Sequence, residues 1–294
     1  MFRALRCYTL KVVLALSVLS AILYGWSDYM GGRAARLMPA LRVTLLMEFM
    51  MIVVYALGVA IVPSAWSWTA VLWGALAGLG GTIGVTAFYA ALASGSMSIA
   101  SPITGTTSAV IPVLVGLSIG ERPGTVTLIG IALAVGSVAL ISATSADGER
   151  SVSRRQLVLS IAAGGSFGLW FIGLERAGED SGWWPLLAAR MCALPAVLIV
   201  YLVLRRRGFD PVGLRGRAGF YWAISAGLAV LIANIVYLVA VRDGLLSVTA
   251  AVVSLYPAST VALAMMVDRE RLGRIQAIGV GLALSALVLV GLGG

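Results

Sequence analysis

The sequence contains no histidine and only two cysteines, Cys7 and Cys192. Histidine and clustered cysteine are the usual ligands of zinc and other transition metals, so their scarcity argues against a metal centre. The two cysteines are too far apart in the chain for a CxxC motif, and isolated cysteines among apolar neighbours usually pack as small hydrophobic side chains. We therefore predict no metal and no cofactor.

Charge is also scarce, because only 11% of the 294 residues are charged, against about a quarter in a typical soluble domain. Hydrophobic residues make up 60% of the chain and recur in blocks of about twenty, a length that crosses a bilayer as a helix. The net charge of +9 comes from arginines at the block ends, where they meet headgroups, so it does not indicate a nucleic-acid partner. The chain has no Walker motif, which excludes ATP-driven transport by this chain.

These features predict an all-α integral membrane fold, with one membrane domain over 1–294. The segments between the apolar blocks are too short to hold a separate soluble domain. Polar and charged breaks divide the domain into ten transmembrane helices, at 10–32, 40–62, 68–92, 97–119, 124–143, 156–176, 184–204, 218–241, 246–267 and 273–292.

A repeated motif, E-R-x-G-x5-G, precedes and enters the fifth and the tenth span. A shift of 149 residues superimposes Glu121 on Glu270 and Gly130 on Gly279. The repeat divides the chain into two five-helix halves, 1–146 and 147–294. Because five is odd, the second half must enter the membrane from the opposite side, which makes the halves inverted repeats, an architecture of secondary transporters. Acids suit the positive end of a helix, so we expect Glu121 and Glu270 to cap the final helix of each half.

The two halves, the proline and arginine that begin spans two and seven (Pro39 with Arg42, Pro185 with Arg190) and the glutamate–glycine turns resemble the EamA-type transporters of the drug/metabolite transporter superfamily. The resemblance covers nearly the whole chain. It implies a ten-helix inverted-repeat carrier with a central cavity, often an exporter of amino acids or other small metabolites, in the plasma membrane. The related small multidrug resistance proteins carry a glutamate in the middle of their first helix. Residues 20–24 hold no acid here, so their exchange mechanism is not indicated.

Polar side chains occur at helical spacing in several spans, and polar groups in a bilayer usually face protein or a water-filled cavity. The candidates for lining a substrate cavity are Tyr24, Asp28, Tyr89, Trp170, Asn234, Tyr237 and Tyr256. The alternative is that such residues only bond neighbouring helices to one another.

Glu48, in the second span, is the most deeply embedded acid. One interpretation is a protonatable site that couples transport to a proton gradient. The alternative is an ion pair with an arginine such as Arg42 or Arg190. These arginines lie just inside corresponding spans of the two halves, where they can bind a carboxylate or extend towards the headgroups. We expect the second of these.

We predict a secondary-active transporter that moves a small solute, such as an amino acid, by alternating access. Alternatives with the same fold are a drug translocase and a lipid-linked-sugar translocase, the latter with a cavity open laterally to lipid. An intramembrane enzyme would need a convergent catalytic constellation that the sequence does not offer. A channel would need repeated filter residues, which are not visible.

Orientation and assembly stay open at this point. Arginines are more numerous in the loops opposite the termini, which favours termini outside the cell, whereas the family resemblance favours termini inside. The fifth and tenth spans are apolar and contain Gly130, Gly136, Gly279 and Gly281, which suits close packing and a homodimer interface.

Overall fold

The computed structural model describes residues 2–94, 97–142, 153–207, 217–256, 258–259, 263, 266–267 and 274–292. Within these residues the regular structure is helical. The α-helices are α1 (Phe2–Leu37), α2 (Ala40–Ile61), α3 (Trp68–Ser94), α4 (Met97–Ser118), α5 (Thr125–Ser142), α6 (Arg154–Arg176), α7 (Trp184–Arg206), α8 (Arg217–Asp243), α9 (Leu246–Val253) and α11 (Arg274–Leu292). These bounds lie within a few residues of the predicted spans, except that α1 begins earlier. The predicted span 246–267 coincides with α9 at its start and lies partly outside the described residues.

Six of the described helical segments are long and apolar enough to cross a membrane. They are Lys11–Ala34, Leu41–Ile61, Trp68–Phe88, Arg154–Arg176, Trp184–Arg206 and Gly219–Asp243. Ile103–Ser118 and Thr125–Ser137 are shorter apolar helices. The prediction of an all-helical membrane protein is therefore confirmed.

The helices end at the breaks that the sequence marks. The hydroxyl of Ser153 accepts a hydrogen bond from the backbone nitrogen of Gln156 at 3.1 Å and caps α6. The connection from α6 to α7 contains a short 3-10 helix, Glu179–Ser181, between Gly178 and Gly182. These glycines have φ values of 88° and 52°, a region that glycine adopts without steric strain. The chain can therefore reverse within a few residues.

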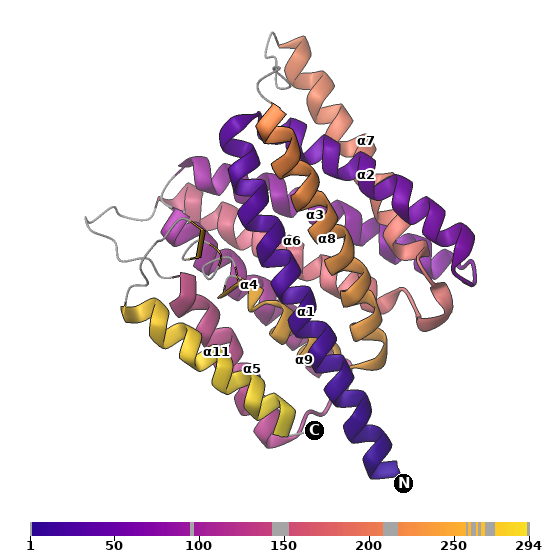
Figure 1. Ribbon diagram of the computed structural model, residues 1–294, viewed down its shortest axis with the longest axis vertical. Helices are drawn as coiled ribbons and strands as arrows, with labels where there is room; N and C mark the ends of the chain where they lie inside the picture. The colour runs from indigo at the N-terminus through magenta and orange to yellow at the C-terminus, as the bar shows by residue number, and fades with distance from the viewer. Residues whose placement is uncertain are drawn as a thin grey trace.

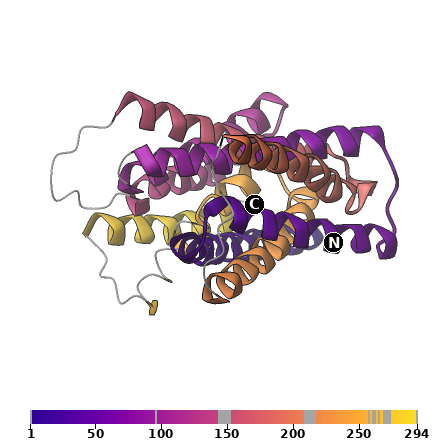
Figure 2. The same ribbon diagram turned by 90° about the horizontal axis from the view of Figure 1, so that it is seen from above.

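Helices from the first part of the chain pack against helices from the second part (Figure 1). α1 lies along α8, α3 along α6, α2 against α7 and α5 against α11. Figure 2 shows α1 and α8 on one side of the bundle, with α3 and α6 on the opposite side. The main apolar cluster lies between these pairs and includes Met51, Tyr55, Phe171 and Leu238. Any group at this centre is therefore shared between the two parts of the chain.

The expectation that Glu121 caps the final helix of the first half is wrong. Oε1 and Oε2 of Glu121 accept hydrogen bonds from the backbone nitrogens of Leu246 and Ser247, at 2.6 and 2.9 Å. Glu121 thus caps α9 and not α5, the helix that follows it. The physical reason is that α4 packs on α9, which brings the unsatisfied amides of the first turn of α9 to the carboxylate. Glu270 lies outside the described residues.

Candidate functional site

A directed chain of hydrogen bonds crosses the centre of the bundle. The indole nitrogen of Trp170 donates to the hydroxyl of Tyr24 at 3.3 Å, and this hydroxyl donates to Oδ1 of Asn234 at 2.6 Å. Nδ2 of Asn234 donates to the hydroxyl of Tyr55 at 3.1 Å. The hydroxyl of Tyr55 donates in turn to the carbonyl of Leu231 at 3.2 Å. We call Tyr24, Tyr55, Trp170 and Asn234 the central network.

The central network connects four helices. Trp170 comes from α6, Tyr24 from α1, Asn234 from α8 and Tyr55 from α2. Each side chain-to-side chain bond therefore joins the first part of the chain to the second. Hydrogen bonds in a low-dielectric interior are strong and polarise one another, so this series of hydrogen bonds can fix the relative position of these helices.

An ion pair continues this polar centre. Nη1 of Arg190, on α7, lies 2.8 Å from Oε1 of Glu48, on α2, and both side chains are 8% exposed. The guanidinium carbon of Arg190 lies 4.9 Å from the centre of the Trp170 ring, a cation–π distance. The expectation that Arg190 extends to the headgroups is therefore wrong. Its side chain is held inside because a buried carboxylate and an aromatic face lie within its reach.

Glu48 thus has the arginine partner that the alternative interpretation named. Only Oε1 is bonded to the guanidinium. Oε2 has no hydrogen-bond partner among the described residues, although it is buried. A coupling role for Glu48 stays a prediction. The predicted coupling site now consists of Glu48 together with Arg190.

Tyr55 is a member of the central network that the sequence interpretation missed. It is fully buried, and its ring packs edge-on against Trp183 at 6.2 Å. A signal was present, because Glu48, Met51 and Tyr55 follow a spacing of three and four residues, which puts them on one face of a helix. That face is the one that α2 turns to the polar centre.

The other predicted cavity residues lie in different environments outside the central network. Tyr237 is fully buried, and its hydroxyl donates to the carbonyl of Phe171 at 3.2 Å, so it forms part of the packed interior. Asp28 is exposed and Tyr256 is half-buried. Tyr89 lies on α3, and its side chain is outside the described part of the structure. The structure thus brings Tyr24, Trp170 and Asn234 into direct contact.

Replacing Asn234 with leucine should weaken the central network as a whole. The substitution removes the acceptor of Tyr24 and the donor to Tyr55 while keeping a similar volume. Buried polar groups that lose their partners cost about 1–3 kcal/mol each, so the unfolding temperature of the purified protein should fall clearly. Ser285→Ala is the control, since Ser285 is exposed and, among the described residues, its hydroxyl bonds only to Gly281 of its own helix. An equal effect of both changes would contradict a special role of the network.

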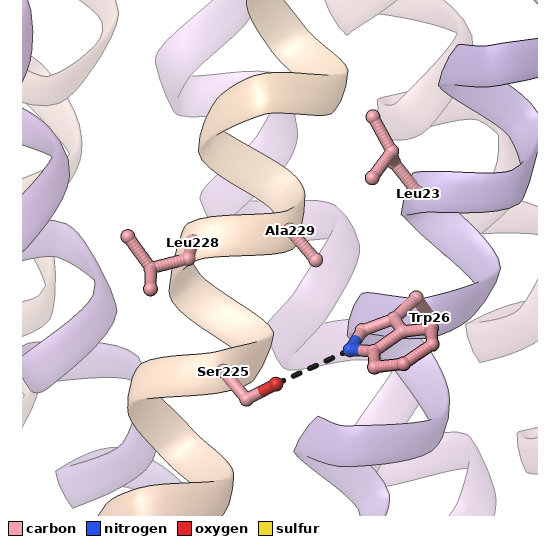
Figure 3. Close-up of a pocket in the computed structure, with 5 residues that line it drawn as sticks. All are labelled: Leu23, Trp26, Ser225, Leu228 and Ala229. Atoms are coloured by element: carbon pink, nitrogen blue, oxygen red, sulfur yellow. Dashed lines mark hydrogen bonds between the residues drawn. The ribbon is translucent and has the colours of Figure 1, made fainter.

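A shallow pocket of about 320 Å³ lies elsewhere, between α1 and α8 (Figure 3). Its lining residues are Leu23, Trp26, Ser225, Leu228 and Ala229. The indole nitrogen of Trp26 donates to the hydroxyl of Ser225 at 3.2 Å across it. Trp26 and Leu228 are 40% and 47% exposed, so this pocket lies on the outer surface and contains none of the predicted cavity residues.

The profile of the EamA-like transporter family matches residues 11–143 and again residues 154–292. A crystal structure is similar over 94% of this chain and 95% of its own, with a TM-score of 0.74 and 16% identity. At that identity the likeness shows the fold alone. No curated protein matches the chain. Two family matches that together cover most of the sequence show that the chain belongs to the EamA-like transporter family, whose members are membrane transporters and not enzymes.

Proposed function

We propose that this protein is a secondary-active transporter that exports small metabolites, such as amino acids, by alternating access. It spans the plasma membrane ten times, as two inverted five-helix halves, 1–146 and 147–294. The observation that carries the proposal is the polar centre, in which Glu48, Arg190 and the central network join helices of both halves. A solute that exchanges hydrogen bonds with these groups acts on both halves at once.

The pairing of helices supports the inverted repeat. If the halves are equivalent, α1 corresponds to α6 and α3 to α8. The packing of α1 on α8 then has its counterpart in the packing of α6 on α3, and both are among the most extensive helix contacts. In the same scheme α2 corresponds to α7 and α5 to α11, and the two helices of each of these pairs pack together. A two-fold axis in the membrane plane would produce this pattern.

The distribution of contacts supports alternating access. Glu121 binds the start of α9, and the backbone nitrogen of Ala65, which follows the end of α2, donates to the carbonyl of Asp180 at 2.8 Å. In helices that alternate in direction, these ends lie on the side where α1 begins. Contacts between the halves therefore close that side. Towards the end of α1, Asp28 is exposed. One closed and one more open side are expected of a carrier at rest in one state.

Uptake and counterflow in proteoliposomes test the proposal, using a labelled amino-acid mixture with and without a pH gradient. We expect saturable flux that the gradient drives, and we expect Glu48→Gln to keep counterflow but to lose the response to the gradient. Glutamine retains a bond to Arg190 but cannot carry the proton. If the variant responds normally, Glu48 has no part in coupling. If no amino acid is transported, the drug or lipid-linked-sugar alternatives are favoured.

Assembly is a smaller part of the proposal. A Cβ atom at Gly136 or Gly281 would meet no other atom within 4 Å, and both glycines are exposed. The outer surface of α5 and α11 is thus free of bulky side chains at these points. A homodimer through this surface is proposed, and cross-linking in the membrane tests it.

A further inference from the structure

Asp28 is exposed on the face of α1 that points into the bundle. Ser17, Ala21, Tyr24 and Asp28 follow one another at intervals of three or four residues, which places them on one face of the helix. Ser17 and Ala21 are buried, at 0% and 6% exposure. This face therefore packs against protein at one end and becomes accessible near Asp28.

The opposite face of α1 is the outer one. Leu19, Ile22 and Trp26 are 43%, 47% and 40% exposed, as expected of side chains that meet lipid. At 100° per residue, Asp28 lies about 180° from Leu19 and about 160° from Trp26 around the helix axis. The exposed Asp28 thus lies on the side of α1 away from these lipid-exposed residues. Gly32, one turn further along, faces open space, because a Cβ atom there would meet nothing within 4 Å.

Among the described residues, no cation pairs with Asp28. Tyr24 lies one helical turn before Asp28 on the same face of α1. Asp28 forms no hydrogen bond or ion pair with the part of the chain that the structure describes. The nearest basic residue along α1, Arg33, donates to the hydroxyl of Tyr29 at 3.0 Å and stacks on the ring of Trp222 at 4.9 Å.

The charges at the centre leave Asp28 uncompensated. Glu48 and Arg190 neutralise one another, so among the described side chains of the polar centre they add no net charge. A carboxylate at membrane depth is costly without a partner, and such residues commonly mark the path of a substrate or an ion. A positively charged group of the solute would supply the missing partner.

We propose that Asp28 binds the ammonium group of the transported solute, beside the aromatic ring of Tyr24, which lies one turn earlier on the same face of α1. This inference rests on the proposed transport function and narrows its substrate class to compounds with an amino group. A carboxylate accepts charge-assisted hydrogen bonds from an ammonium, and aromatic rings attract the same cation. The body of the solute then extends along α1 towards Tyr24 and the central network. Amino acids and simple amines share the group that Asp28 recognises.

Four probes separate these sources of the ammonium group. They are norvaline, butylamine (norvaline without its carboxylate), pentanoate (norvaline without its amino group) and butanol, which carries no charge. Binding to the purified full-length protein in detergent is measured by the increase in unfolding temperature with ligand concentration. We expect butylamine, norvaline or both to raise the unfolding temperature, and pentanoate and butanol to have no effect. Stabilisation by norvaline alone would identify an amino acid, and stabilisation by butylamine would identify an amine as sufficient.

Variants of Asp28 complete the test. Asp28→Asn should weaken binding of the stabilising amine about ten- to a hundredfold, the loss expected for one charge-assisted hydrogen bond. Asp28→Glu should retain part of it, and Asp243→Asn, at an exposed acid at the end of α8, should retain all of it. Unchanged amine binding by Asp28→Asn, or stabilisation by pentanoate but not by the amines, would overturn the proposal.

The same variants distinguish this proposal from the proposed function. Binding that depends on Asp28 in a protein without flux in proteoliposomes would support the amine site and reject the transport mechanism. Amino-acid flux that Asp28→Asn leaves intact would support transport and reject the site.

Discussion

Arg190→Met should strongly destabilise the protein. The substitution removes the cation that lies 2.8 Å from Glu48 and leaves an acidic side chain that is 8% exposed without its partner. Breaking a buried ion pair at one member costs about 3–5 kcal/mol, because the remaining charge has lost both water and its counter-ion. We expect a lower unfolding temperature, a poor yield of monodisperse protein in detergent and little flux. Chemical unfolding of the purified variant, compared with the parent protein, gives the magnitude.

The double variant Glu48→Gln with Arg190→Met is the decisive control. It removes both charges, so no buried ion is left, and most of the lost stability should return. The difference between the single and double changes measures the coupling between the two side chains. If the loss of stability in the double variant equals the sum of the losses in the two single variants, the pair contributes no coupling energy. Arg176→Met supplies a second control, since Arg176 has a more exposed side chain and pairs with its neighbour Glu175.

Gly78→Leu should disrupt the packing of α3 on α7. A Cβ atom at Gly78 would overlap the backbone carbonyl of Ala189, and one at Gly74 would overlap that of Pro185. Backbone atoms cannot move aside as the end of a side chain can, so the helices would have to separate. Overpacking costs about 1–3 kcal/mol for a few added methylene groups and more where the backbone must shift. We expect loss of the folded, monodisperse species in size-exclusion chromatography.

Gly136→Leu is the matched control for this prediction. Gly136 is also a glycine inside an apolar helix, but a Cβ atom there meets nothing within 4 Å. The variant should fold and elute as a single, monodisperse species, because a leucine there has room and glycine is the poorer helix former. If both leucine variants fold equally well, α3 and α7 are less closely packed than the structure indicates. If Gly136→Leu changes only the oligomeric state, the dimer proposal gains support.

The positions of the helices could be predicted closely from the sequence. α3 was expected at 68–92 and α6 at 156–176, and the structure has Trp68–Ser94 and Arg154–Arg176. The reason is that the bilayer fixes the length of an apolar block, and charges or turn residues mark its ends. The family and the division into two halves followed from the repeated glutamate–glycine motif in the same way. The apolar blocks and the repeated motif are local or periodic features of the sequence, so hydropathy and residue spacing are enough to find them.

The contacts of the site could not be predicted in this way. Glu48 and Arg190 are 142 residues apart, and the sequence left coupling and pairing open for Glu48 while it favoured snorkelling for Arg190. Tyr55 was missed, and Glu121 was assigned to the wrong helix. In a membrane helix most faces are apolar, so hydropathy does not say which face meets which partner.

The sequence by itself therefore determined the class of protein, the helices, their approximate ends and the repeat. The tertiary structure alone decided which polar side chains meet at the centre, that Arg190 is held inside, and that Asp28 is exposed on the face of α1 that carries Ser17 and Tyr24. The physical reason is that these contacts arise where the two halves pack together. That packing is set by the shapes of the helix surfaces, above all where Gly74 and Gly78 let α7 approach α3, and not by the apolar character that all the helices share.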